Sequence, residues 1–365
     1  MSVQRFVTVE EIDFIATGAW ILGTGGGGDP YLGSLALKAL YADGARVPLI
    51  GASDLPDDAM VGVVSQMGAP VVNLERTVDP EMTIKPVLMM ERHAKRQFDA
   101  LMLSEIGGGN ALQPLIAGAK LGRPVVDADT MGRAFPSVFH TSFAIGDLVS
   151  HPYALADIRN NEIMVMKCED WLWNERMARK ILVEWGSRAF SCKAPRTGRE
   201  VKEWGIHGSV SQAIDIGRAV HTACQQHDDP IEAVLKQQRG RRLFGGKVID
   251  VERRATAGHL RGVCEFDGLD ADRGTKYRLE FQNEFLVGRR DGEIEVTTPD
   301  LICVLDSVSG EAVGTERLRY GQRVTVIALP SPKLFLTPKG LHHTAPRAFG
   351  LDFDFVSAFG AGAGK

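Results

Sequence analysis

The sequence predicts an α/β N-terminal domain with parallel βαβ units and glycine-rich strand ends, followed by a smaller all-β domain. Residues 99–132 have the order strand, glycine turn, helix and strand, which is typical of a right-handed βαβ unit. The later part of the chain consists of short strands separated by turn sequences, and no helix fits between them. We therefore expect an α/β domain at 1–245, an all-β domain at 246–332, and a C-terminal segment at 333–365 that returns to the first domain.

Two helices and a strand are expected early in the chain. The first helix begins at Thr8 as N-cap, because Glu11 three residues later completes a capping box. The second has Ser34 as its N-cap and Gly44 as its C-terminal stop. The β-branched run at 60–68 predicts a buried strand.

The middle of the chain, 162–240, is expected to contain one strand and three helices. The strand covers 162–168, and the helices cover 169–186, 209–224 and a segment that begins with Asp229 as N-cap. The strands of the all-β domain are expected at 247–256, 259–266, 276–290, 301–307 and 322–330.

Polar side chains follow the predicted strands of the βαβ unit. In open α/β sheets, ligands bind beyond the carboxyl ends of the strands. By this rule four side chains converge on one edge, namely Glu105, Asn110, Asp127 and Asp129.

The run "LGTGGGGDPY" at 22–31 has three interpretations: a phosphate loop, a turn without a ligand, or one wall of a small-molecule site. A phosphate loop would carry Lys and Ser or Thr after its last glycine, whereas here an aspartate follows. We favour the third interpretation, since "EIGGGN" repeats the glycine pattern and glycine N–H groups can clamp an oxyanion. The substrate-binding candidates are Gly25, Gly26, Gly27, Gly28, Asp29, Gly108, Gly109 and Asn110; the alternative role of Asn110 is a helix N-cap.

Asp127 and Asp129 are two residues apart and so share one side of a strand if the chain is still extended there. Such a pair suits a general base or a divalent metal, and the alternative is that one caps a turn while the other is solvated. Arg133 lies close enough in sequence to pair with either acid. We expect catalytic roles for Asp127, Asp129 and Glu105, with His342 protonating a leaving group.

No sequence motif specifies a metal site, because HExxH, HxH and CxxC patterns are missing. The candidate cofactor is nevertheless a divalent metal, zinc before others, held by Asp127, Asp129 and His140. No nucleotide cofactor is expected.

The net charge of −4 and the pI of about 6.2 argue against nucleic acid or an anionic membrane as partner. The apolar runs are too short to span a bilayer, and the five scattered cysteines suit a reducing cytoplasm. We expect a cytoplasmic homo-oligomer that acts on a small molecule.

Seven segments together resemble the family named for S-methyl thiohydantoin desulfurase, over nearly the whole chain. These segments are "ILGTGGGGDPY", "EIGGGNAL", "DADTMGRAFP", "IHGSVSQAIDIGRAV", "NEFLV", "TPDLICVLDSVSGEAVGTERLRYGQRVTVIALP" and "PRAFG". The resemblance implies a hydrolase in which water replaces a methylthio group on a five-membered amide-like ring, releasing methanethiol and a hydantoin. Members of this family also look like companions of hydantoinase and oxoprolinase systems, so the alternative to the hydrolase is a non-catalytic ligand-binding subunit or regulator of such a system.

Overall fold

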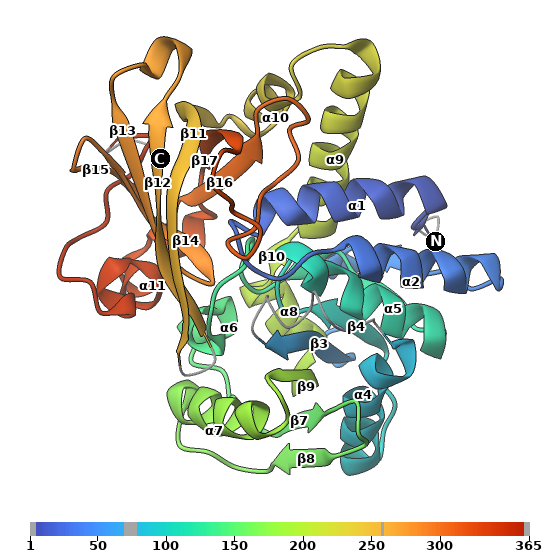
Figure 1. The fold of residues 1–365 in the computed structure, drawn as a ribbon. Coiled ribbons are helices and arrows are strands. Elements are labelled where there is room, and N and C mark those ends of the chain that lie inside the picture. Colours follow the sequence, from blue (N-terminus) through green and yellow to red (C-terminus); the bar gives the residue numbers. More distant parts are fainter. Residues whose placement is uncertain (1–4, 69–78, 257–258, 361–365) are drawn as a thin grey trace.

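The computed structural model describes residues 5–68, 79–256 and 259–360, which form two sheets and their covering helices (Figure 1). Within these residues the first sheet has eight strands. In spatial order they are β1 (Arg5–Phe6), β2 (Pro48–Ile50), β5 (Val125–Val126), β4 (Ala100–Leu103), β3 (Met60–Gly68), β9 (Arg188–Thr197), β7 (Tyr153–Ala156) and β8 (Glu162–Val165).

The centre of this sheet is parallel, as the sequence predicted. β2, β5, β4 and β3 run in one direction, and α5 (Leu112–Leu121) connects β4 to its neighbour β5. Gly122 ends α5 in the left-handed conformation, with φ 64°, a backbone geometry that glycine adopts without a steric penalty. β9, β7 and β8 then extend the sheet in antiparallel fashion beside β3.

Helices cover both faces of the first sheet (Figure 1). One face and the layer outside it hold α1 (Val9–Leu22), α2 (Tyr31–Ala42), α4 (Pro80–Ala94), α5, α9 (Ser209–Gln226) and α10 (Pro230–Gln238). The other face holds α6 (Ser142–Ile145), α7 (Trp171–Glu184) and α8 (Gly198–Trp204). Short 3₁₀ turns are η1 (Ala52–Asp54), η2 (Gly108–Ala111), η3 (Val138–His140), η4 (Asp270–Asp272), η5 (Lys333–Leu336) and η6 (Pro346–Phe349).

The second sheet is antiparallel throughout and has seven strands within the described residues. In spatial order they are β15 (Glu293–Thr297), β14 (Glu284–Arg290), β13 (Lys276–Gln282), β12 (His259–Gly268), β11 (Arg241–Thr256), β17 (Arg323–Leu329) and β16 (Leu301–Asp306). A separate two-stranded ribbon pairs β6 (Ala128–Asp129) with β10 (Ile206–His207).

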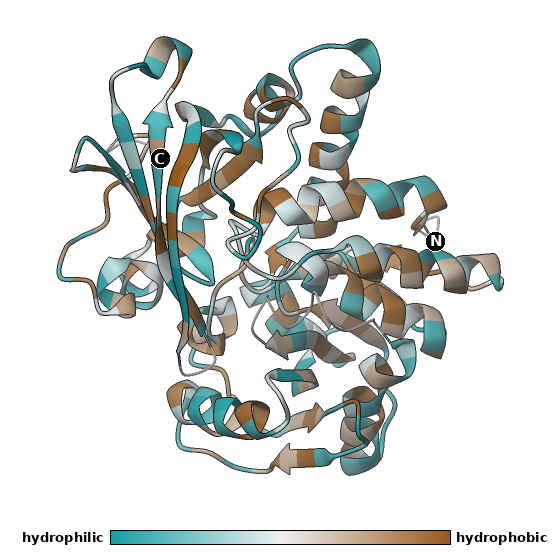
Figure 2. Ribbon diagram, in the orientation of Figure 1, coloured by the Kyte–Doolittle hydropathy of each residue, from teal (hydrophilic) through white to brown (hydrophobic). Residues whose placement is uncertain are grey.

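The side chains of β16 pack into the cores of both domains. Side chains on β16 point alternately to opposite faces, so Leu301 and Leu305 join the core that contains α1 and α9. Ile302 and Val304 face the other way and join the core of the second sheet. Figure 2 shows hydrophobic stretches alternating with hydrophilic ones along the strands and helices of both domains.

The chain ends with α11 (Pro338–Thr344), which belongs to a segment that contacts both domains. Phe335 packs with Met131 and Ile145 of the first domain. Val356 exchanges hydrogen bonds with Thr297 at the end of β15, at 2.8 and 2.9 Å. The boundary expected at residues 245 and 246 falls inside β11.

Some local predictions are confirmed and others are wrong. Thr8 and Glu11 form the predicted capping box of α1. Ser34 is not the N-cap of α2, because the helix begins after Pro30 and the Ser34 hydroxyl donates to the carbonyl of Tyr31. The predictions omitted α4, β7, β9 and α8. Among the described helices, none combines the length and the apolar character that crossing a membrane requires.

Candidate functional site

A polar pocket opens at the carboxyl ends of β3 and β4, where the second sheet approaches the first. Its cavity volume is about 70 Å³. Most of its lining comes from the first domain, and two residues come from the second sheet: Asn283 between β13 and β14, and Glu284 at the start of β14. The lining residues used below are Gly27, Gly28, Ser65, Ser104, Glu105, Asn110, Glu175, Arg179, Lys193, Asn283 and Glu284.

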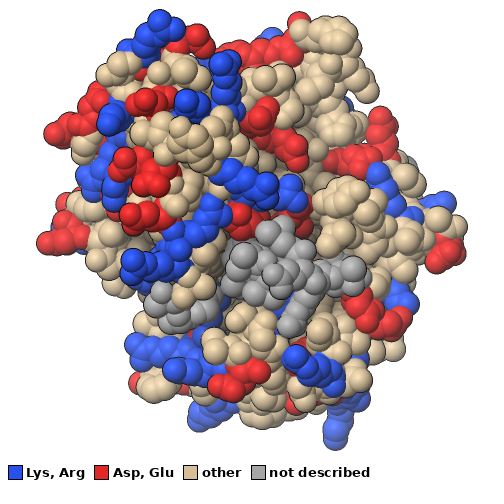
Figure 3. Space-filling view, in the orientation of Figure 1, with Lys and Arg blue, Asp and Glu red and all other residues tan. Residues whose placement is uncertain are grey.

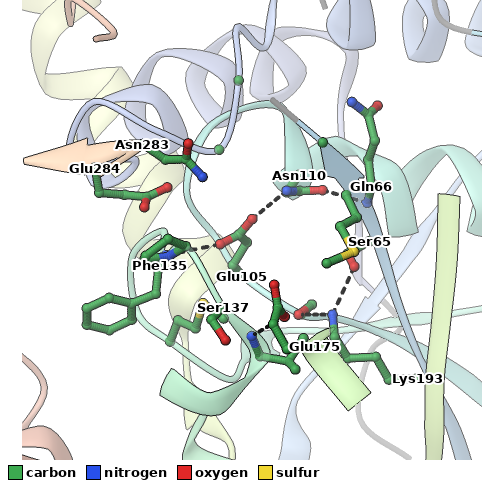
Figure 4. Close-up of a pocket in the computed structure, with 18 of the residues that line it drawn as sticks. Ser65, Gln66, Glu105, Asn110, Phe135, Ser137, Glu175, Lys193, Asn283 and Glu284 are labelled. Carbon is green, nitrogen blue, oxygen red and sulfur yellow. Dashed lines mark hydrogen bonds between the residues drawn. The ribbon is translucent and has the colours of Figure 1, made fainter. Parts of the chain in front are cut away.

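Glu105 lies at the centre of the pocket, two residues after β4 ends (Figure 4). One carboxylate oxygen accepts a hydrogen bond from the Asn110 side chain, and the other accepts from the backbone N–H of Phe135 at 3.2 Å. Asn110 is itself fixed by the backbone N–H of Gln66 on β3, at 2.7 Å. Burial raises the pKa of Glu105 to about 7, although the positive charge of Lys193 and both hydrogen bonds oppose that rise.

Lys193 reaches the same pocket from β9. Its Nζ donates to the hydroxyl oxygens of Ser65, at 2.9 Å, and Ser104. Burial lowers the pKa of Lys193 to about 8, while the negative charges of Glu105 and Glu175 oppose that fall. A lysine whose pKa is lowered toward neutral pH and a carboxyl group whose pKa is raised thus face one cavity. This arrangement is typical of acid–base sites.

An ion pair and a carboxyl group complete the lining. The carboxylate of Glu175 on α7 accepts a hydrogen bond from Nε of Arg179 at 2.6 Å. It also accepts one from the backbone N–H of Val138 at 3.1 Å. Burial alone would raise the pKa of Glu175, but the charge of Arg179 and these hydrogen bonds lower it. Glu284 is buried, and burial raises its pKa well above the usual range. Its Oε2 has no hydrogen-bond partner within the described chain, so a ligand N–H would satisfy it.

The two glycine loops pack against each other at the edge of this pocket. The N–H of Gly109 donates to the carbonyl of Gly28 at 2.7 Å. A Cβ on Gly27 would lie 2.2 Å from the carbonyl oxygen of Gly107, and a Cβ on Gly26 would lie 1.9 Å from Glu284. Close backbone packing therefore requires a glycine at Gly27, whereas Gly26 leaves room for the side chain of Glu284. Gly27 and Gly28 line the pocket, and within the described chain their N–H groups have no hydrogen-bond acceptor.

Asp127 and Asp129 lie outside the pocket lining and point to different partners. Asp127 accepts the backbone N–H groups of Val210 and Ser211, and so caps the start of α9. Asp129 is fully buried and accepts three backbone N–H groups, from Ile106, Met131 and Gly132. Burial raises the pKa of Asp129 to about 7, against the effect of these bonds.

Arg133 links the two domains. It is fully buried and donates to the carbonyls of Pro299 and Asp300, both at 3.0 Å, and to the hydroxyl of Thr24 at 2.8 Å. The predicted pairing of Arg133 with the neighbouring aspartates is therefore wrong, because its guanidinium is used between the domains.

The other candidate residues are spread over the molecule. His140 is buried among aromatic rings, where its Nδ1 contacts the carbonyl of His343 at 2.6 Å and burial lowers its pKa to about 4. His342 is exposed on α11, and Asp29 pairs with Arg317. Gly25, Gly26, Gly108 and Gly109 belong to the packed loops rather than to the pocket lining. Nowhere in the described ranges do three His, Cys, Asp or Glu side chains converge as metal ligands.

The pocket residues contributed by β9, α7 and β14 were not among the candidates predicted from the sequence. Lys193 lies two residues after Ser191, so the two share one face of a strand, and "SRAFSCKAPRT" was not assigned as a strand. Glu175 and Arg179 are four residues apart on a predicted helix, which is a signal for an ion pair. Nothing local indicates that Glu284 approaches the first domain.

Two family models match the chain in succession. Residues 10–167 match the S-Me-THD-like N-terminal domain, and residues 169–358 match the S-Me-THD-like C-terminal domain. The pocket takes residues from both matched ranges.

A solved structure has the same fold. It is the crystal structure of a protein from Chromobacterium violaceum determined by the Northeast Structural Genomics Consortium, with a TM-score of 0.81 and 21% sequence identity. The similarity covers 97% of this chain and 100% of that chain. No curated protein matches the sequence.

Proposed function

The chain belongs to the S-Me-THD-like family, and from this premise we propose that it is a hydrolase acting on a small five-membered amide-like ring. S-methyl thiohydantoin is the substrate type for which the family is named. The proposed reaction replaces the methylthio group with oxygen from water and releases methanethiol and a hydantoin.

One observation carries this proposal: Glu105 is a buried carboxyl group with a pKa raised to about 7, facing a polar cavity. A general base works best when its pKa is near the operating pH. Glu105 would remove a proton from the water molecule that supplies the new ring oxygen. In this proposal Glu105 is the general base. Asp127 and Asp129 have structural roles, in which Asp127 holds the start of α9 and Asp129 holds the neighbouring loops.

Two further groups suit a ring of this type. The unpartnered Oε2 of Glu284 would accept a ring N–H. The N–H groups of Gly27 and Gly28 would stabilise negative charge that develops on a ring oxygen or nitrogen during attack. Charged side chains of both signs are interspersed on the molecular face shown in Figure 3.

The proposal is tested by incubating the purified full chain with S-methyl thiohydantoins and measuring hydantoin by chromatography. A thiol-reactive dye would be unsuitable for methanethiol, since the exposed Cys224 would react too. We expect turnover by the wild type and a loss of about 10²–10⁴-fold in kcat for Glu105→Gln.

The matched control is Glu91→Gln. Glu91 is 8% exposed and Glu105 is 9% exposed, and each accepts a backbone N–H, but Glu91 lies on α4 outside this pocket. Equal losses in both variants would contradict a catalytic role for Glu105. Tight ligand binding without turnover by the wild type would instead favour a ligand-binding subunit or regulator.

A further inference from the structure

The face of the first sheet that lines the pocket carries a lysine among three serines. Side chains two residues apart on a strand share one face, so Ser191 and Lys193 lie together on β9. Ser65 on β3 is the register partner of Ser191. Ser104 follows β4, and its N–H bonds the carbonyl of Val64 at 3.2 Å, so Ser104 lies beside Ser65.

The buried Lys193 has hydroxyl partners instead of a carboxylate partner. Its exposure is 5%, and its Nζ donates to Ser65 and Ser104. Within the described part of the chain, no carboxylate lies in ion-pairing distance of this Nζ. A buried lysine without a counterion gives up its proton readily, and a neutral amine next to a hydroxyl is a base for that hydroxyl.

The two serines differ in their other contacts. The hydroxyl of Ser65 also bonds the hydroxyl of Ser191 at 2.8 Å. Among the described residues, the hydroxyl of Ser104 has one hydrogen-bond partner, which is Nζ of Lys193. Ser104 lines the pocket and directly precedes Glu105, so a nucleophile and a general base would stand on successive residues.

We propose that Ser104, activated by Lys193, is a nucleophile that forms a covalent intermediate with the substrate ring. In the first step Lys193 takes the hydroxyl proton, and the serine oxygen bonds the ring carbon. The C–S bond breaks, and the departing thiolate takes the proton from Lys193 to become methanethiol. The ring is then held on Ser104 through a C–O bond.

Water completes the reaction in a second step, in which Glu105 acts. Glu105 takes a proton from water as the water oxygen bonds the ring carbon. The bond from the ring to Ser104 breaks, and the serine oxygen takes the proton from Glu105. The remaining proton of the water moves to the ring nitrogen, which gives the hydantoin.

The chemistry on thiohydantoins rests on the function proposed above, whereas activation of Ser104 by Lys193 does not. The test therefore uses methanesulfonyl fluoride, a small reagent that sulfonylates activated serines with release of fluoride. Peptide mass spectrometry of the labelled full chain locates the adduct. We expect the label on Ser104 of the wild type, and also on Ser104 of Glu105→Gln, which retains both Ser104 and Lys193.

Matched variants show whether Ser104 is labelled because Lys193 activates it or only because the reagent can reach it. Ser104→Ala is expected to lose the label and Ser65→Ala to keep it, while Lys193→Met is expected to slow labelling at least about tenfold. The melting temperature of each variant shows whether it is folded. A label on Ser65 or on Lys193, no label, or an unchanged rate in folded Lys193→Met would overturn the proposal.

The two proposals can fail separately. Labelling of Ser104 without any thiohydantoin turnover would overturn the proposed function and support the activated serine. Turnover without labelling would support the proposed function and overturn the activated serine.

Discussion

The neighbouring strands β4 and β5 both end in carboxylates, but these carboxylates contact different kinds of group. After β5, Asp127 and Asp129 accept backbone N–H groups from α9, from the loop after β4 and from the turn that directly follows Asp129. At the end of β4, Glu105 is held by the side chain of Asn110 and by one backbone N–H, and it faces a cavity. A carboxylate whose oxygens accept hydrogen bonds from backbone N–H groups holds chain segments in place. A carboxylate that faces a cavity can instead bind a ligand.

Beyond the loss of kcat expected for Glu105→Gln, the largest effect of this difference is on the pH dependence of turnover. Glu105 and Lys193 act as bases only when deprotonated, and their pKa values are about 7 and about 8. Activity should therefore rise at least about tenfold between roughly pH 6 and pH 8. Initial rates of hydantoin formation across this range measure the effect. If the rates are flat, neither group acts as a base.

The glycine loop against the end of β4 should tolerate no side chain at Gly27. Its φ is 72°, and a Cβ would lie 2.2 Å from the carbonyl oxygen of Gly107. Gly27→Ala should cost roughly 2–4 kcal/mol of unfolding free energy, because a left-handed alanine is strained and backbone atoms cannot move aside cheaply.

Gly44→Ala is the control for this substitution. Gly44 also has a positive φ, 95°, but nothing lies within 4 Å of an added Cβ. Only the conformational cost of about 1 kcal/mol should remain. Equal losses in the two variants, measured by denaturant unfolding, would mean that loop packing is unimportant.

Removing the side chain of Asp127 should affect stability more than chemistry. Asp127→Ala removes an acceptor for two N–H groups at the start of α9, which should cost about 1–2 kcal/mol. The turnover rate per folded molecule should stay close to that of the wild type. A loss of activity as large as that of Glu105→Gln would reverse the comparison between the two strand ends.

The last expected effect is on the pH dependence of the stability of Glu105→Gln. In the folded chain the pKa of Glu105 is about 7, above its ordinary value of 4.5, so the folded state holds this proton more tightly. The stability that this contributes is present below about pH 4.5 and is lost as the pH rises through about 7. Glu105→Gln should therefore have the higher melting temperature at about pH 8, and the advantage should shrink as the pH falls and vanish below about pH 4.5.

The sequence by itself determined the elements whose cause is local. The capping box of Thr8 and Glu11 and the N-cap Asp229 were predicted because neighbouring residues satisfy the helix ends. The parallel βαβ unit followed from a strand, a helix and a strand in succession. The same reasoning put Glu105 and Asn110 at one edge of the sheet, where the structure joins them by a hydrogen bond.

Only the tertiary structure decided which carboxylates face the cavity. Asp127 turns toward α9 because the N–H groups of Val210 and Ser211 come to it from far along the chain. Lys193 reaches the pocket because β9 pairs with β3. Glu284 reaches it because the second sheet packs against the glycine loops. These contacts join residues far apart in sequence, so no local periodicity or spacing could indicate them.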